Sequence, residues 1–105
     1  MLEIQNKVDK FNKLAHGNNK TPVHARLLDC ISKLGELSKE YLKSTDYGDK
    51  EFSLHKDFEL ELGDTMYSLL SLANEVGINV EEAVDKVLNK YKERLSKFNN
   101  IGSGK

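Results

Sequence analysis

Several features that mark other protein classes are scarce or absent in this chain. Cys30 is the single cysteine among 105 residues, so no disulfide can form within the chain. No apolar run approaches the ~18 residues that span a bilayer, and the segment after Met1 is too polar for a secretory signal. We therefore expect a cytoplasmic protein with no membrane partner. A single proline and 31% charged residues favour helices over a turn-rich sheet fold.

An excess of charge of one sign is also lacking. Sixteen basic and 17 acidic residues leave a formal net charge of −1. Because nucleic acids and anionic membranes attract proteins with a basic excess, we expect no nucleic-acid partner. The length suffices for one domain with one core, so every motif should lie in the same fold.

Apolar residues recur at helical spacing in four segments. The first segment covers residues 2–15 and ends at HGNNK, which is rich in turn formers. The second begins with Thr21 as the N-cap and Pro22 at the first helical position, and it extends to about Lys43. A third helix follows the STDYGDKE loop over about residues 52–75.

The fourth helix is bounded by local signals on both sides. Gly77 ends the preceding helix, and Asn79 with Glu82 three residues later resembles a capping box. This helix extends to Phe98. We therefore predict a single all-α, four-helix bundle-like domain over residues 1–98 and a flexible tail over residues 99–105. The GSGK ending lacks the leading glycine, strand and helix of a phosphate-binding loop.

The apolar faces of these helices are wide for so short a chain. A monomer of this length buries only about two-thirds of its unfolded surface. We therefore expect the core to be completed by oligomerisation of identical subunits.

A ridge of three acids borders the apolar stripe of the third helix. On a helical wheel Asp57, Glu61 and Asp64 fall along one edge of that stripe. Their mutual repulsion would be reversed by a divalent cation, and Mg²⁺ prefers carboxylate oxygens while keeping waters that a phosphate can displace. The alternative is that these acids are the solvated border of an amphipathic helix.

Glycines interrupt two of the predicted helices next to an acid. Gly35 precedes Glu36, as Gly63 precedes Asp64, although a helical glycine costs about 1 kcal/mol relative to alanine. Such a glycine lets another helix or a ligand approach the backbone closely.

The helical wheel of the second predicted helix argues against a metal or catalytic site on its acidic side. Glu36, Glu40 and Asp29 lie nearly opposite the apolar stripe formed by Leu27, Ile31 and Leu34. They should be exposed to solvent unless another helix or a neighbouring subunit covers this side.

The fourth helix carries a basic ridge of Lys86, Lys90 and Arg94 at intervals of four. The ridge could face phosphates, or its cations could simply complement the helix dipole. Histidines 16, 24 and 55 share no metal-ligand spacing. Cys30 lies on the core-side flank of its helix, which favours a packed thiol over a nucleophile.

The acidic segments are similar to those of the MazG-like all-α nucleotide pyrophosphohydrolases over residues 22–98. ELGD at 61–64 fits the family's ExxD element, and GEL at 35–37 fits the end of its ExxE element. The 24 residues between Glu36 and Glu61 are typical of the family. One position departs, because Lys33 stands where the first glutamate of ExxE is expected.

The resemblance implies Mg²⁺-dependent hydrolysis, with Mn²⁺ as an alternative, of a nucleoside triphosphate to monophosphate and pyrophosphate in a homodimer or homotetramer. Nucleotide-pool housekeeping would be its role. The residues it implies for catalysis and metal binding are Glu36, Glu61 and Asp64, with Glu40 as a substitute metal ligand and Lys90 and Arg94 on the phosphates.

Two alternatives remain open at this point. Lys33 could mark a non-catalytic helical interaction module of the same fold with a degenerate metal site. The chain could also be a pyrophosphohydrolase for a specialised substrate such as dUTP or a modified nucleotide.

Overall fold

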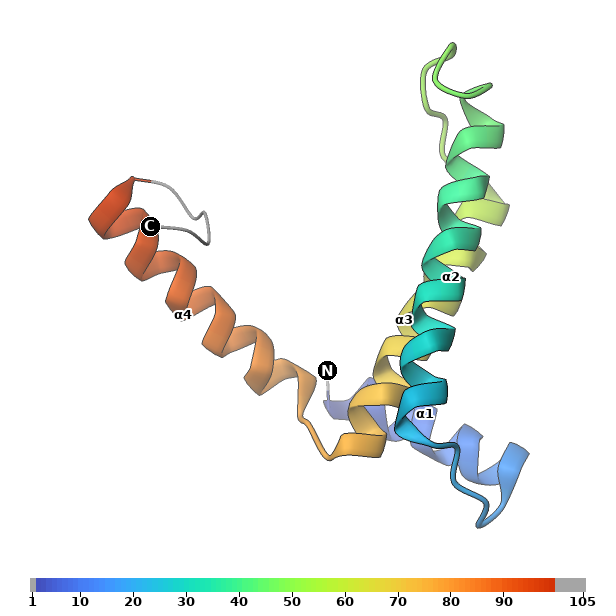
Figure 1. Cartoon of the computed structure of the whole chain (residues 1–105), viewed down its shortest axis with the longest axis vertical. Coiled ribbons are helices and arrows are strands. Elements are labelled where there is room, and N and C mark those ends of the chain that lie inside the picture. Colours follow the sequence, from blue (N-terminus) through green and yellow to red (C-terminus); the bar gives the residue numbers. More distant parts are fainter. Residues whose placement is uncertain (1, 100–105) are drawn as a thin grey trace.

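The computed structural model describes residues 2–99 and contains four helices with no strand among those residues (Figure 1). The predicted all-α, four-helix fold is confirmed. The predicted tail over residues 99–105 lies almost entirely outside the described residues. The helices are α1 (Leu2–His16), α2 (Val23–Ser44), α3 (Lys56–Val76) and α4 (Val80–Phe98).

Two predicted helix starts are displaced. Pro22 is itself the N-cap of α2, so the prediction of Thr21 as the cap was wrong by one residue. Helix α3 begins at Lys56 rather than near Phe52, because the Phe52 ring stacks on Tyr41 and meets Phe58 edge-on outside the helix.

The predicted end of α3 at Gly77 and the predicted cap of α4 at Asn79 are confirmed. Gly77 ends α3 in the left-handed conformation, with φ of 75°, which glycine adopts without strain. The Asn79 side chain accepts a hydrogen bond from the backbone N–H of Glu82 at 3.1 Å and caps α4.

Helices α2 and α3 lie antiparallel and pack through a polar seam. Ser68 Oγ donates to Asp29 Oδ2 at 2.8 Å, and Thr65 Oγ1 donates to the carbonyl of Lys33 at 3.3 Å. Cys30, which follows Asp29 on α2, is buried as a packed thiol, as predicted. These contacts fix the register of the two helices, since each joins one defined turn of α2 to one turn of α3.

The apolar stripe of α2 faces away from this seam. Leu27, Ile31 and Leu34 are 51%, 63% and 55% exposed. The wheel separated the two faces of the helix correctly, but α3 covers the polar face. The side that carries Asp29 and Glu36 therefore packs within the chain, while the leucine-rich side does not.

Helix α4 diverges from the α2–α3 pair and contacts α1 (Figure 1). The radius of gyration is 17.0 Å, whereas a compact domain of this length has about 13 Å. The accessible surface is 8122 Å², against about 5,900 Å² for a compact monomer of this mass. One copy therefore leaves much apolar surface in water, and completion of the core by oligomerisation stays a prediction.

Helix α1 is tied to the α3–α4 turn by one buried glutamine. Gln5 Nε2 donates to Asn74 Oδ1 at 3.0 Å and to the carbonyl of Ile78 at 2.8 Å, while its Oε1 accepts from the N–H of Val80 at 2.8 Å. These bonds fix the direction in which α4 leaves. Within residues 2–99, no helix is both long and apolar enough to cross a bilayer.

Candidate metal centre

Three of the predicted site residues meet across the α2–α3 seam. Glu36 on α2 and Glu61 and Asp64 on α3 each place one carboxylate oxygen within 4.8 Å of the others. The bond from Thr65 to the Lys33 carbonyl sets this register, because it aligns the turn before Glu36 with the turn after Glu61. We refer to Glu36, Glu61 and Asp64 as the acidic triad.

Glu61 is the most constrained member of the acidic triad. Its Oε2 atom is buried and has no hydrogen-bond partner among the described residues. Burial raises the pKa of the Glu61 carboxyl, with further contributions from Glu36, Asp64 and Glu40, while Lys33 lowers it.

An orphaned buried carboxylate oxygen is unfavourable unless a ligand satisfies it. A divalent cation would both supply a partner for Glu61 and relieve the repulsion within the acidic triad. Carboxylate oxygens are the ligands that Mg²⁺ and Mn²⁺ accept, so the side chains present fit such an ion.

Lys33 lies beside the acidic triad. Its Nζ atom is 3.8 Å from Glu36 Oε2 and 4.0 Å from Asp64 Oδ2, and only 28% of its side chain is exposed. The ammonium therefore stands at the edge of the position that a cation held by the three carboxylates would take.

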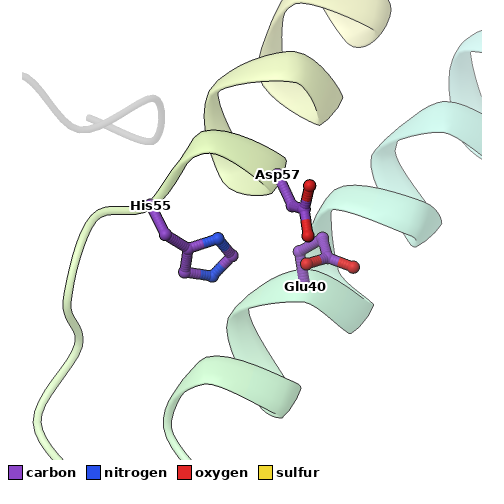
Figure 2. A group of neighbouring side chains, drawn as sticks. All are labelled: Glu40, His55 and Asp57. Atoms are coloured by element: carbon purple, nitrogen blue, oxygen red, sulfur yellow. The ribbon is translucent and has the colours of Figure 1, made fainter.

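Glu40 lies one helical turn from Glu36 and belongs to a second group. Figure 2 shows Glu40 on α2 facing His55 and Asp57, which precede and begin α3. One ligand atom from each of these three side chains lies within 4.8 Å of the others.

Glu40 is already partly satisfied there, since its side chain is 15% exposed and its Oε2 lies 3.3 Å from Lys43 Nζ. Glu40 and Asp57 thus belong to a second group that neighbours the acidic triad, and the charge of Glu40 contributes to the raised pKa of Glu61. His55 could not be recognised from the sequence, because it shares no metal-ligand spacing with the acids and joins them only as the residue that precedes α3.

A pocket of about 370 Å³ adjoins both groups. Glu36, Glu40 and Glu61 line it together with Lys39 and Tyr47. This volume lies in the range of small-molecule clefts, so a ligand could reach the acidic triad from solvent.

The predicted phosphate-binding residues lie elsewhere. Lys90 and Arg94 project from α4, where both cations approach the ring of Tyr91 at 5.9 and 6.0 Å from its centroid. Because α4 diverges from the α2–α3 pair, one chain does not bring these cations to the acidic triad (Figure 1).

Gly35 and Gly63 do not relieve crowding within the chain. A methyl group added at either position would meet no atom within 4 Å. The close helix approach expected at these glycines is therefore not observed among the described residues.

Comparison with known proteins supports the resemblance. The family described as the MazG nucleotide pyrophosphohydrolase domain matches residues 27–98. The chain is 33% identical over 97 residues to the uncharacterized protein YpjD of Bacillus subtilis, covering 90% of this chain and 85% of that protein.

A solved structure agrees with the fold. The chain resembles the crystal structure of YpjD from Bacillus subtilis, a candidate pyrophosphatase, with a TM-score of 0.70 at 33% identity. The match covers 88% of this chain and 92% of the other.

Replacing Lys33 with glutamate should tighten Mg²⁺ binding at the acidic triad. The Lys33 ammonium lies 3.8 to 4.0 Å from two of the carboxylates. At that distance two unit charges interact by about 4 kcal/mol at an effective dielectric constant near 20, and screening by solvent and salt lowers this energy. We expect Lys33→Glu to raise the affinity at least tenfold, about 1.4 kcal/mol, in metal titrations at 0.15 M salt. Lys10→Glu, the same charge change on α1, should have no such effect. Equal midpoints for the parent and Lys33→Glu would place the ion away from residue 33.

Glu61→Gln should stabilise the metal-free protein at neutral pH. Because the Glu61 pKa is raised, the folded state binds the carboxyl proton of Glu61 more tightly than the unfolded state does. The free energy of unfolding therefore falls as the pH rises from the ordinary pKa of glutamate through the raised pKa of Glu61. Glutamine mimics the neutral form, and its advantage should shrink on acidification below that window. Urea unfolding with a chelator at several pH values measures the difference.

Two comparisons make the Glu61 test specific. Glu59→Gln, the same exchange at an exposed position on α3, should not reproduce the stabilisation at neutral pH that is expected of Glu61→Gln. Mg²⁺ should stabilise the parent more than Glu61→Gln. A Glu61→Gln protein less stable than the parent at neutral pH would show that the Glu61 carboxylate is well satisfied without an ion.

Proposed function

Because the chain belongs to the MazG nucleotide pyrophosphohydrolase family, we propose that it hydrolyses a nucleoside triphosphate to the monophosphate and pyrophosphate with Mg²⁺ or Mn²⁺. The observation that carries the proposal is the orphaned, buried Oε2 of Glu61 among three converging carboxylates. Nucleotide-pool housekeeping in the cytoplasm is the role that we propose for this activity.

Each member of the acidic triad has a part that follows from its surroundings. Glu36 and Asp64 are exposed and can hold an ion from the solvent side. Glu61 supplies the buried ligand atom. The bound ion would neutralise charge on the polyphosphate and promote attack by water.

The phosphate contacts require a second chain in this proposal. Lys90 and Arg94 lie on the diverging α4, and the exposed stripe of Leu27, Ile31 and Leu34 needs a cover. We propose a homodimer or homotetramer in which α4 of one copy brings its basic ridge to the acidic triad of another.

The rival function is a helical interaction module without catalysis, which the position of Lys33 favours. Its ammonium already contacts two members of the acidic triad and could replace the ion. A panel of standard and modified nucleotides, including dUTP, assayed with Mg²⁺ or Mn²⁺ separates the functions. Inactivity across the panel would favour the module, and release of orthophosphate would contradict the proposed bond cleavage.

Asp64→Asn should abolish turnover and leave the helical content unchanged. The substitution keeps the size of the side chain but removes one of only three ligand charges. Pyrophosphate release and circular dichroism measure the two effects. Asp57→Asn is the matched control, since it makes the same change on α3 outside the acidic triad and should retain activity. Full activity in Asp64→Asn would refute the assignment of the site.

Mixing two inactive variants tests whether the site is shared between copies. Asp64→Asn retains an intact α4, and Arg94→Ala retains an intact acidic triad. After subunit exchange, their mixed oligomers should regain measurable pyrophosphate release, because one site then combines both intact parts. A mixture of Asp64→Asn and Glu61→Gln should stay inactive, since both damage the acidic triad. No recovery in the first mixture, or a monomer in sedimentation at high micromolar concentration, would contradict the shared site.

A further inference from the structure

Among the described residues, Arg26 is a buried cation with an unpartnered N–H group, and it lies far from the acidic triad. Arg26, in the first turn of α2, is only 8% exposed, and its Nε atom is buried without a hydrogen-bond partner. Among residues 2–99 no carboxylate lies within 4.0 Å of its guanidinium as an ion-pair partner. Arginine stays protonated at every accessible pH, so the buried charge cannot be neutralised by losing a proton. The buried Nε–H is therefore unfavourable unless an acceptor reaches it.

Arg26 lines a pocket that an anion can enter. The pocket has a volume of about 170 Å³ and lies where the end of α1 and the loop over residues 17–20 meet α2 and α3. Since a water molecule occupies roughly 30 Å³ in the liquid, the pocket has room for a tetrahedral oxyanion with bound water. Gly17 turns the chain here in the left-handed conformation, with φ of 63°.

The charges around the pocket favour an anion. Lys13, Lys20 and Arg26 line it against two acids, Asp9 and Glu75, and His16 adds a further nitrogen donor or acceptor. Lys13 Nζ lies 3.0 Å from Asp9 Oδ2, so that pair largely satisfies itself. The lining then holds Arg26 and Lys20 against one remaining acid, the half-buried Glu75, which makes no ion pair with Arg26 in the described structure.

We propose that this pocket binds a phosphate-type oxyanion through the Arg26 guanidinium. The planar fork of arginine can give two parallel hydrogen bonds to one phosphate group, and a small movement of the buried side chain would let the orphaned Nε donate one of them. Arg26 precedes Glu36 by ten residues on α2, about 15 Å along the helix, so this anion is separate from a polyphosphate held at the acidic triad. The proposal does not depend on the proposed hydrolysis.

Titration of the metal-free, full-length protein with inorganic phosphate tests the proposal. At pH 7 and 0.15 M chloride, with a chelator present, we expect saturable NMR shifts of the Arg26 Nε–H and of the amides of residues 17–19. Arg26→Met keeps an apolar stem of similar length and should weaken binding at least tenfold. Arg26→Lys retains the charge but lacks the fork, so it should bind with intermediate affinity. Lys10→Met removes a cation from α1 outside the pocket and should leave the affinity unchanged.

A second readout covers the case in which Arg26→Met folds poorly. Phosphate should raise the melting temperature of the parent and of Lys10→Met with increasing concentration, and raise that of Arg26→Lys less. Equal affinity for a nucleoside monophosphate would identify phosphate alone as the ligand, whereas tighter binding of the monophosphate would identify a phosphate ester.

Three results would overturn the proposal. The first is the absence of saturable shifts in the parent. The second is an affinity that does not change in Arg26→Met or Arg26→Lys. The third is binding that occurs only in Glu75→Gln, because Glu75 would then be the partner of Arg26 in the native chain.

Discussion

The fold depends on one constraint, which is that α2 and α3 join through polar groups of fixed register rather than through their apolar stripes. The bonds from Ser68 to Asp29 and from Thr65 to the Lys33 carbonyl allow one alignment of the helices. That alignment places Glu36 opposite Glu61 and Asp64 at the edge of the seam. The same constraint turns the leucine-rich side of α2 outward, so a carboxylate cluster and an uncovered apolar surface have one common cause.

Much of the architecture could be predicted from the sequence because helical periodicity and local end signals are properties of short segments. Gly77 and Asn79 bound their helices through their own backbone and side-chain chemistry. The start of α3 could not be predicted in this way, because Phe52 is held outside the helix by rings that lie elsewhere in the chain.

The choice of packing face could not be predicted either. A wheel ranks faces by apolarity, and for α2 it selected Leu27 and Ile31, whereas the chain buries Cys30 and Arg26 instead. The acidic triad was found through the family resemblance, since spacing within α2 alone placed Glu36 in solvent. The burial of Arg26 gave no signal in the sequence, because a basic residue near a helix start is ordinarily solvated.

The hydrogen bonds of Gln5 on α1 have a consequence for the order of folding. The bonds of the α2–α3 seam join residues 32 and 39 positions apart, whereas Gln5 bonds to groups 69 to 75 positions away. Closing a longer loop costs more chain entropy, and that cost must be met before the distant contact stabilises anything. The α2–α3 hairpin can therefore form as an early local unit, while α1 docks late and sets the direction of α4 only when the rest of the chain has already collapsed.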